Sequence, residues 1–465
     1  MATQTTHLSS LPPVAGRNSL SLVEVKIDEL VLPKAALRRH PKAQIEKLKE
    51  SILHFGWVSP ILIDKDRNVI AGQARIAAAK ALGLVSAPAV RADHLSEAEV
   101  RAYRIADNKL AEAAEWDEEL LAIELREIEV LGIDLELTGF ETPEIDILFT
   151  TEAEDTATED RFDPPAEDGV AVAQIGDLWR LGDHLLLCGN ALHAESYDRL
   201  LGGDLVDMVF TDPPYNVPVK GHMGGLGSVQ HREFVMASGE MSPEAFKEFL
   251  LTTMVRAKTH ARDGGVIFTC IDWRSVAPLF EVTDKAGLEP INLCVWNKTN
   301  GGMGSLYRSK HELVLVARVP GQGQTNNVEL GRHGRNRTNV WDYPGANTLG
   351  QGSDLNLHPT VKPVALVADA IQDVTKRGET VLDMFGGSGS TLIAAERVGR
   401  RAQLIELDPL YVDTIIRRFE AEFDVRAELV GSGQVFGEVE ERRADQSIAP
   451  STKTRVRRRP SELEG

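Results

Sequence analysis

Apolar runs alternate with amphipathic segments between residues 205 and 423, and no other feature of the sequence constrains the fold as much. Six apolar runs have the length of strands: 205–211, 266–271, 291–297, 312–318, 380–384 and 402–407. Five segments have the length and pattern of helices: 243–262, 275–286, 363–376, 390–399 and 409–423. Because strands that alternate with helices form a sheet covered by helices, the sequence predicts an α/β fold. A glycine-rich connection without a helix joins 291–297 to 312–318, which favours an antiparallel pair at one edge of the sheet.

An acidic segment divides the chain into two parts. The stretch "TEAEDTATEDRFDPPAED" contains eight acids and one arginine, a composition typical of a solvated linker. The part before it reads as "LVEVKIDEL" (strand), "AQIEKLKESILHFG" (helix), "PILIDKDRNVIA" (strand) and "GQARIAAAKALG" (helix), with Gly56 and Gly83 at expected helix ends. The predicted division is a small α+β domain, a helical extension, the linker, a larger α/β domain and a disordered tail, at 21–110, 111–150, 151–168, 170–425 and 426–465.

Composition narrows the class of protein. The formal net charge of the 465 residues is −19, although "STKTRVRRRP" near the end is basic and can attract phosphates or simply keep the chain in solution. No apolar run approaches the roughly 18 residues of a membrane span, and the first residues do not have the pattern of a secretory signal. The three cysteines are scattered, which argues against a disulfide framework or a metal site. We therefore expect a cytoplasmic protein without a membrane span or a bound metal.

The first motif that carries chemistry is "VDMVFTDPPY", which ends a predicted strand at Asp212, Pro213, Pro214 and Tyr215. Two prolines fix φ and remove two backbone donors, so the turn after the strand is stiff. It presents one carboxylate and one aromatic ring, which suits a flat ligand. Proline and aspartate also favour an ordinary exit from a strand, so this motif alone leaves both interpretations open.

The second motif is a glycine-rich turn in "TVLDMFGGSGSTLIAAERVGR", between a strand that ends at Asp383 and a helix that begins near Ser390. Such a turn lets backbone N–H groups approach a ligand. It lacks the lysine of a P-loop and the third glycine of a dinucleotide fingerprint. Glu406 ends the next strand, 17 residues after Gly389, where it can accept hydrogen bonds from ribose hydroxyls or cap the following helix. An adenosine ligand with few or no phosphates fits this site, and S-adenosyl-L-methionine is such a ligand.

Together, "DPPY" and "LDMFGGSGST" resemble the DNA methyltransferases that modify the exocyclic amino groups of adenine or cytosine. The catalytic motif comes first and the glycine-rich motif last, as in the β class of that family. The segments "LHPTVKPVAL", "VWNKTNGGMGSLYRSKHELVLV" and "IELDPLYVDTIIRR" also resemble parts of it. The resemblance covers about 170–423 and implies a Rossmann-like sheet that binds S-adenosyl-L-methionine. The cofactor-binding residues that it implies are Asp383, Phe385, Gly386, Gly387, Gly389, Thr391, Glu406, His358, Thr360 and Lys362.

The same resemblance implies a mechanism and a substrate, which is double-stranded DNA. Asp212 would accept a hydrogen bond from the target amino group, assisted by a carbonyl of Pro213–Pro214, and Tyr215 would stack on a flipped base. Asp212 at the first motif position favours adenine N6 over cytosine N4, which stays open as a target. Two different functions also stay open: a partition-type DNA-binding protein with an auxiliary methyltransferase half, and a methyltransferase that acts on RNA or on protein glutamine.

Residues 321–353 are predicted to read the target sequence. They carry Arg332, Arg335 and Arg337 among asparagines and glycines, and arginine and asparagine are the residue types that read guanine and adenine edges. A charged surface loop without such a function is the competing interpretation. No nuclease motif is evident, so we expect a modification enzyme related to restriction-modification systems that acts without its own nuclease.

Residues 21–110 resemble the ParB/sulfiredoxin-like domain of chromosome-partition proteins. Those proteins hold nucleotide phosphates with a Gly-Glu-Arg-Arg turn, and here the turn is Gly72-Gln73-Ala74-Arg75. Arg75 at a helix N-terminus can meet a phosphate or DNA. One arginine and the acid are missing, which leaves nucleotide hydrolysis open, and docking or nonspecific DNA contact is the other interpretation of this domain. The sequence leaves a homodimer open.

Overall fold

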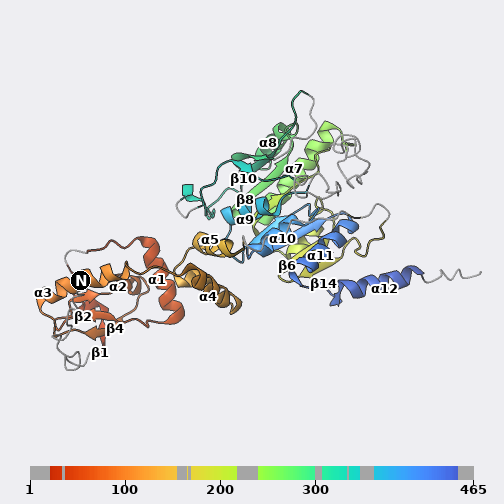
Figure 1. Ribbon diagram of the computed structural model, residues 1–465. Helices are drawn as coiled ribbons and strands as arrows, with labels where there is room; N and C mark the ends of the chain where they lie inside the picture. The colour runs from red at the N-terminus through yellow and green to blue at the C-terminus, as the bar shows by residue number, and fades with distance from the viewer. Residues whose placement is uncertain are drawn as a thin grey trace, which may run out of the picture. The chain divides into compact units, whose positions relative to one another are not determined.

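The computed structural model describes residues 21–33, 37–153, 165, 169–216, 239–298, 306–331, 335–345 and 361–448. The chain divides into two compact units, Met1–Ala153 and Glu154–Gly465 (Figure 1). Most of the predicted linker and all of 449–465 lie outside the described residues. Among the residues that are described, no helix is long and apolar enough to cross a membrane.

The first unit contains a four-stranded sheet in the order β1-β4-β2-β3. Its strands are β1 (Leu22–Lys26), β2 (Ile61–Ile63), β3 (Val69–Ala71) and β4 (Ser86–Arg91), and its helices are α1 (Lys42–Phe55), α2 (Gln73–Ala81) and α3 (Glu97–Ala111). Ile61, Ile63 and Ile76 are buried at its centre. Gly56 and Gly83 follow α1 and α2 with positive φ, as predicted. A helical extension follows, with α4 (Glu118–Val130), a short 3₁₀ turn (Leu135–Thr138) and α5 (Thr142–Ala153).

One segment of this unit that was predicted to be a single strand forms a hairpin of two strands. The segment "PILIDKDRNVIA" forms β2 and β3, because the carboxylate of Asp64 accepts hydrogen bonds from the backbone N–H groups of Asp66 and Asn68 and closes a turn. Arg67 adopts a positive φ of 61° in that turn. The local hydrogen bonds of an aspartate therefore break a run that its apolar residues alone would continue.

The second unit is an α/β domain with an eleven-stranded sheet in the order β11-β9-β10-β8-β7-β12-β13-β6-β5-β14-β15. The strands are β5 (Leu178–Leu181), β6 (His184–Cys188), β7 (Val206–Thr211), β8 (Ala261–Ile271), β9 (Glu289–Asn297), β10 (His311–Arg318), β11 (Val340–Asp342), β12 (Thr380–Asp383), β13 (Arg401–Glu406), β14 (Ala427–Leu429) and β15 (Gln434–Val435). The five central strands, from β8 to β6, run parallel, as a sheet with helical crossovers requires.

Helices cover both faces of this sheet. They are α6 (Ala194–Leu201), α7 (Pro243–His260), α8 (Val276–Lys285), α9 (Val364–Val374), α10 (Ser390–Arg397), α11 (Pro409–Phe423) and α12 (Phe436–Ile448). Met208 and Phe210 of β7 belong to a core shared with α9, α10 and α11, whereas Val209 belongs to a second core shared with α6, α7 and α8. Side chains of a strand alternate between the faces, so each central strand is buried on both sides.

The predicted α/β sheet and its antiparallel pair are confirmed. Strand β10 pairs antiparallel with both β8 and β9, and the short β11 adds a parallel strand outside β9. At the opposite edge, the sequence predicted no element for β5, β6 and α6.

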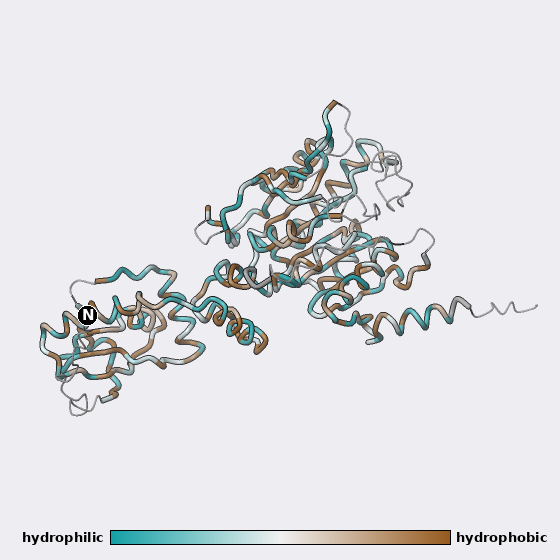
Figure 2. The backbone as a smooth tube through the Cα atoms, in the orientation of Figure 1, coloured by the Kyte–Doolittle hydropathy of each residue, from teal (hydrophilic) through white to brown (hydrophobic). Residues whose placement is uncertain are grey.

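The prediction of a disordered tail from residue 426 is wrong for 427–448. These residues form β14, β15 and α12, and α12 mixes hydrophobic and hydrophilic residues along its length (Figure 2). Phe436 and Val439 are buried, and the ring of Phe436 lies edge-on to Trp179 with centroids 5.4 Å apart. A few apolar side chains within a charged segment are therefore sufficient to dock it on the sheet.

Candidate active site

Three carboxylates meet at one edge of the parallel sheet. Strands β7, β12 and β13 are adjacent and parallel, and they lead into Asp212, Asp383 and Glu406, respectively, at their carboxyl ends. Because parallel neighbours end at the same edge, residues that are 194 positions apart in the chain come together there. This edge is where ligands bind in open α/β sheets.

The glycine-rich turn is held by two of these carboxylates. Asp383 accepts hydrogen bonds from the backbone N–H of Phe385 (3.0 Å) and the hydroxyl of Thr391 (2.6 Å). Glu406 accepts one from the backbone N–H of Gly387 with Oε2 (2.8 Å), and its Oε1 accepts one from the N–H of Asp408 (2.8 Å). Asp408 itself caps α11, so Glu406 is not needed as a cap.

Glycine is required at position 389 of this turn for two reasons. Gly389 precedes α10 with φ 79°, a left-handed conformation, and a Cβ there would lie 3.1 Å from the side chain of Ile415.

Burial raises the pKa of both Asp383 and Glu406 to about 7, although their hydrogen bonds act in the opposite direction. Both carboxylates are therefore short of donors and charges that would stabilise their ionised forms.

Asp212 belongs to a buried network of charged side chains. Its Oδ2 lies 2.5 Å from the ammonium of Lys362, and its Oδ1 lies 2.6 Å from the hydroxyl of Tyr215. The same hydroxyl lies 2.7 Å from Oε1 of Glu312, which Lys362 also contacts at 2.7 Å. Lys298 completes the set at 2.7 Å from Oε2 of Glu312. The Asp212 side chain is 24% exposed, so its carboxylate is open to a ligand on one side.

Four segments of the chain supply this network. Asp212 and Tyr215 follow β7, Glu312 lies on β10, Lys298 follows β9, and Lys362 precedes α9. In the register of β9 and β10, Glu312 lies opposite the buried Trp296. The indole ring of Trp296 is 4.3 Å from the ammonium of Lys298.

The pKa values of the two acids of the network move in opposite directions. Burial raises the pKa of Asp212, and Lys362 offsets this only in part. Burial also acts to raise the pKa of Glu312, but the two ammonium groups beside it outweigh burial and hold its pKa at about 2. For Lys362, burial is outweighed by Asp212 and Glu312, which raise its pKa. Glu312 is therefore firmly ionised, and Asp212 is the acid of the network that takes up a proton more readily.

Asp212, Cys270 and Glu312 are close enough to hold a cation, with their ligand atoms within 4.8 Å of one another. The ammonium of Lys362 already lies between the two carboxylates, 2.5 Å and 2.7 Å from them. The protein thus supplies the positive charge at this point with its own side chain.

Lys362, which the sequence assigned to the cofactor, connects the two halves of the site. Its side chain contacts Asp212, and its backbone carbonyl accepts a hydrogen bond from the hydroxyl of Ser390 (2.7 Å), at the start of α10. Phe385 packs against Phe249 beside the turn. Pro213 is buried and Pro214 is half-buried between Asp212 and Tyr215. His358, Thr360 and Arg332 lie outside the described residues.

The structure does not support base reading by Arg335 and Arg337. Arg335 Nη2 lies 2.8 Å from Asp373, and Arg337 contacts Asp373 at 3.1 Å and Asp369 at 2.9 Å. Arg337 also donates to the hydroxyl of Tyr343 (2.7 Å). The side chains are only 10% and 20% exposed, so both guanidinium groups attach their segment to α9. The prediction that they read DNA is corrected, because most of their donors are used within the protein and the remaining ones, Arg335 Nε and Arg337 Nη2, are buried.

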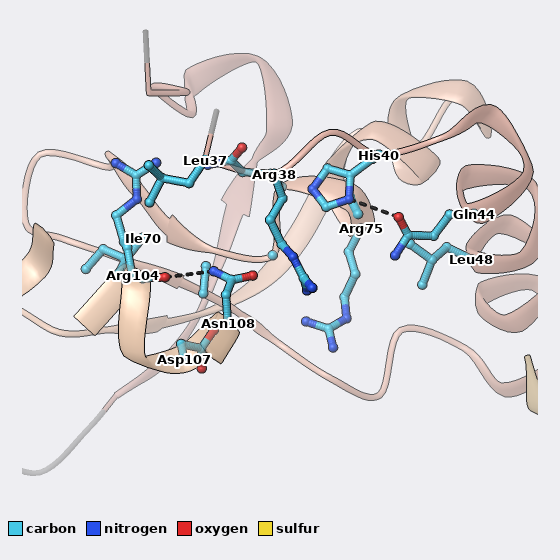
Figure 3. A pocket seen from close by; sticks show the side chains of 14 residues that line it. Leu37, Arg38, His40, Gln44, Leu48, Ile70, Arg75, Arg104, Asp107 and Asn108 are labelled. Atoms are coloured by element: carbon cyan, nitrogen blue, oxygen red, sulfur yellow. Dashed lines mark hydrogen bonds between the residues drawn. The ribbon is translucent and has the colours of Figure 1, made fainter. Parts of the chain in front are cut away.

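Arg75 lies in the first unit and lines a cavity of about 240 Å³ (Figure 3). Arg38 and Arg104 line the same cavity, together with Gly72 and Asn108. Figure 3 labels the side chains of Arg38 and Arg75 among those that line the cavity. Among the described residues, no carboxylate pairs with Arg75, whereas Arg38 pairs with the exposed Glu112 at 2.6 Å. One acid, Asp107, also lines the cavity, so with three arginines the lining is basic on balance.

Comparison with known protein families supports the prediction made for each of the two units. Residues 206–417 match the family described as "DNA methylase", with the N6 and N4 types in one family. Residues 206–417 form a DNA methylase domain. Residues 15–108 match the ParB N-terminal domain, and 119–174 match the HTH domain of ParB-methyltransferases. The predicted combination of an N6/N4-type DNA methyltransferase with a ParB-like domain is confirmed, and with it the prediction of S-adenosyl-L-methionine as the cofactor.

Known proteins resemble the methylase domain. The type II methyltransferase M2.DpnII of Streptococcus pneumoniae is 27% identical over 244 residues, which span 50% of this chain and 89% of that protein. The type II methyltransferase M.HpaI of Haemophilus parainfluenzae is 23% identical over 256 residues, or 52% of this chain and 76% of that protein. Among solved structures, the cytosine-N4-specific PvuII DNA methyltransferase has a TM-score of 0.39 and 14% identity, and the match covers 60% of this chain and 94% of the other.

Sequence reasoning missed Glu312 and Lys298 as site residues. Both lie in the segment that resembles the family, but residue type alone does not distinguish them from surface charges. An acid at the start of an apolar run, "HELVLV", was the available signal, since an acid that is buried with such a run needs a cation nearby.

Proposed function

We propose that the protein is a site-specific DNA methyltransferase that transfers a methyl group from S-adenosyl-L-methionine to the exocyclic amino group of a flipped base, with adenine N6 as the target. The observation that carries the proposal is the position of Asp212. A partly exposed carboxylate, ordered by Lys362 and Tyr215, stands at the sheet edge that also holds the glycine-rich turn. Cytosine N4 is the alternative target, because its amino group presents the same N–H donors.

Asp212 would act on the geometry of the target nitrogen. The lone pair of an exocyclic amino group is delocalised into the ring, so the nitrogen is a weak nucleophile. A carboxylate that accepts one N–H favours a tetrahedral nitrogen with a localised lone pair. Each oxygen of Asp212 has one contact within the protein, which leaves lone pairs for this purpose. The Tyr215 ring, two residues beyond Pro213, would stack on the base, which must leave the duplex to reach the site.

The residues around the glycine-rich turn fit an adenosine ligand. Glu406 accepts backbone hydrogen bonds from Gly387 and Asp408, with Leu407 beside them, and a carboxylate has about four lone-pair sites, so acceptor capacity remains for a ribose hydroxyl. The elevated pKa values of Asp383 and Glu406, about 7, also fit a ligand that brings hydroxyl and amino donors. When bound, the cofactor supplies an electrophilic methyl group. The protein's part is to hold the reacting atoms in line.

The affinity for the cofactor is expected to rise between about pH 6 and about pH 8, approaching about tenfold per pH unit below the pKa. The reason is that a ribose hydroxyl donates to the ionised form of Glu406, whose pKa in the free protein is about 7, so binding must displace a proton. Calorimetric titration with S-adenosyl-L-methionine across this range measures the effect.

Glu406→Gln is the variant for this pH test, and it should bind more weakly and with a flatter pH dependence. Asp413→Asn is the control. Asp413 is another buried acid of the same unit with a raised pKa, but it accepts hydrogen bonds from Val172 and Ala173, away from the turn. An affinity that is independent of pH in the wild type would show that Glu406 does not meet the ribose.

The transfer itself is tested with labelled S-adenosyl-L-methionine and duplex DNA, followed by digestion and identification of the modified nucleoside. We expect N6-methyladenine. Detection of N4-methylcytosine would support the methyl-transfer reaction and contradict adenine as the target base. Label in neither nucleoside, with DNA of mixed sequence, would overturn the proposed function.

A second proposed function concerns the cavity of the first unit, which we assign to a nucleotide. The observation that favours it is the set of three arginines around a pocket of about 240 Å³, with α2 starting at its wall. Gly72 has φ 98°, and a Cβ there would lie 2.7 Å from Ile61, so only glycine allows the turn to approach so closely. Binding is proposed without hydrolysis, because the turn lacks the acid that partition proteins carry.

Arg75→Ala is expected to lower the affinity for CTP or ATP at least about tenfold, since a charge-assisted hydrogen bond contributes roughly 1.5–3 kcal/mol. Equilibrium titration of the full chain with each nucleotide measures it. Lys80→Ala removes an exposed charge at the other end of the same helix and should bind as the wild type does. Equal binding by both variants would argue against a nucleotide in this cavity.

A further inference from the structure

The hydroxyl of Tyr215 lies between two carboxylates. It is 2.6 Å from Oδ1 of Asp212 and 2.7 Å from Oε1 of Glu312, and both distances are those of O–H···O hydrogen bonds. A tyrosine hydroxyl has one proton to donate and an oxygen that accepts. It can therefore donate to only one of the two acids.

A count of protons shows that the geometry has room for one more. Five short contacts join the network: two at the Tyr215 hydroxyl, two at Lys362 and one at Lys298. With both carboxylates ionised, the hydroxyl supplies one proton and the two ammonium groups supply three, which is one fewer than five. If one carboxylate is protonated and donates to the hydroxyl oxygen, all five contacts become hydrogen bonds.

The position of that proton is set by the neighbouring charges. Lys362 and Lys298 both contact Glu312, whereas only Lys362 contacts Asp212. Glu312 has a lowered pKa and Asp212 a raised one. When the network holds an additional proton, Asp212 Oδ1 is therefore its preferred site, and there the proton points to Tyr215, whose own proton points to Glu312.

From these contacts we infer that Asp212, Tyr215 and Glu312 form a proton relay, which receives the proton released by the methylated amino group and passes it toward Lys298. The inference rests on the proposed function and adds to it a role for two residues, the Tyr215 hydroxyl and Glu312, which positioning of the base alone does not require. Lys298 stands at the outer end, where its side chain is 23% exposed.

The atoms balance as follows. The lone pair of the amino nitrogen forms the new N–C bond, and the electron pair of the S–C bond stays on sulfur as a neutral thioether. The nitrogen then carries one proton too many. Asp212 takes this proton, Tyr215 accepts a proton from Asp212 while it donates its own to Glu312, and Glu312 releases one to solvent past Lys298. No oxidant, reductant or metal takes part.

Other groups also face the relay. Cys270 on β8 and Asp383 at the end of β12 lie near Asp212, and their negative charge, when ionised, favours a protonated Asp212. Lys362 opposes them with a permanent positive charge. Since burial raises the pKa of Cys270, its thiol stays neutral near pH 7 and the balance is set by the carboxylates and lysines.

Tyr215→Phe tests the relay, because it keeps the ring for stacking and removes only the hydroxyl. We expect cofactor and DNA affinities near those of the wild type and a single-turnover rate at least about 10²-fold lower, the smaller end of the usual contribution of a proton-transferring group. The rate of the variant should recover in part as pH rises, since Asp212 must then lose its proton to solvent directly. Tyr197→Phe removes a hydroxyl that is also buried but donates to Ala191 elsewhere in the unit, and it serves as the control.

A readout without cofactor or DNA separates the relay from the proposed reaction. The titration of Asp212 can be followed by NMR with ¹³C at the aspartate carboxyl carbon and assigned by its loss in Asp212→Asn. The Tyr215 hydroxyl accepts from protonated Asp212 and can turn to donate to ionised Asp212, and the charge-assisted bond to the ionised form is the stronger of the two. Tyr215→Phe should therefore raise the pKa of Asp212, whereas Glu312→Gln removes a negative neighbour and should lower it.

A wild-type rate and pH profile in Tyr215→Phe would overturn the relay. Shifts of Asp212 in one direction for both variants would overturn it too, because general loosening of the site would move both alike. If the wild-type protein transfers no methyl group at all, the proposed function fails, whereas the titration still reports on the proton chain.

Discussion

Asp212→Asn is expected to lower the single-turnover rate of methyl transfer by about 10³-fold or more, the range in which the loss of a proton acceptor and of electrostatic stabilisation falls. The substitution keeps the shape of the side chain. It removes the charge that Lys362 neutralises at 2.5 Å, and one oxygen becomes an amide NH₂, which opposes an N–H donor of the base. The target nitrogen would then remain planar and unreactive.

Cofactor binding should survive this substitution. The glycine-rich turn is held by Asp383, Thr391 and Glu406, none of which takes a hydrogen bond from Asp212. Calorimetry with S-adenosyl-L-methionine, beside a rapid-quench assay of labelled DNA, measures both quantities. A variant that transfers slowly because it no longer binds the cofactor would mean that Asp212 belongs to the cofactor site.

Asp272→Asn provides a matched control. Asp272 follows β8, the strand next to β7 and parallel to it, so it stands at the same edge of the sheet. Its carboxylate accepts a hydrogen bond from the backbone N–H of Ser275 (2.9 Å), which begins α8. The amide oxygen of asparagine can still accept this bond, so the variant should unfold with a free energy within about 1 kcal/mol of the wild type and leave the transfer rate near that of the wild type.

The sequence predicted those parts of the site that lie directly at strand ends. Asp212, Asp383 and Glu406 each follow or end an apolar run, and parallel strands place such residues at one edge without further information. The glycine-rich turn could also be recognised in the sequence, because the residues that define it are close together in the chain. Residue type and position within one strand-turn-helix unit were sufficient.

The charged network could not be predicted in this way. Glu312 reaches Tyr215 only because β10 pairs with both β8 and β9 in one register, and Lys362 arrives from a segment 150 residues beyond Asp212. The role of Lys362 also changed, from a cofactor residue to the counter-ion of two acids. The residue type of Arg335 and Arg337 suggested that they read DNA bases. Instead they form ion pairs with Asp369 and Asp373, which lie one helical turn apart on α9.

Lys362→Met is expected to lower the free energy of unfolding of the second unit by about 3–5 kcal/mol near neutral pH, the usual cost of removing one partner of a buried ion pair. Methionine fills a similar volume, so the loss comes from charge rather than from a cavity. Without the ammonium, Asp212 and Glu312 face each other across the Tyr215 hydroxyl with Lys298 as the remaining cation. Lys298→Met is the control with a smaller expected loss, because Lys298 contacts one carboxylate and is 23% exposed.

The pH dependence of this loss gives a second test. In the wild type, the folded-state pKa of Glu312, about 2, lies below its unfolded value of about 4.3, so its ionised form contributes stability above about pH 4 that disappears as pH falls toward 2. In Lys362→Met, the ammonium partner is lost, and burial then raises the pKa values of the Asp212 and Glu312 carboxyl groups above their values in the unfolded chain. The difference between variant and wild type should therefore be largest near pH 7 and shrink as pH falls through about 4, where unfolded carboxylates also become protonated. Urea unfolding at several pH values measures it.

The double variant Lys362→Met, Glu312→Gln separates the ion pair from simple packing. Glutamine removes one of the two acids that Lys362 neutralises, so the double variant should be more stable than the sum of the two single losses predicts, with a coupling of about 1–3 kcal/mol. Additive losses would mean that Lys362 stabilises the unit through its alkyl chain and its backbone bond to Ser390 rather than through charge. Coupling of the expected sign would establish that the lysine holds two like charges together at this sheet edge, which is the condition for Asp212 to remain an acceptor in a largely buried site.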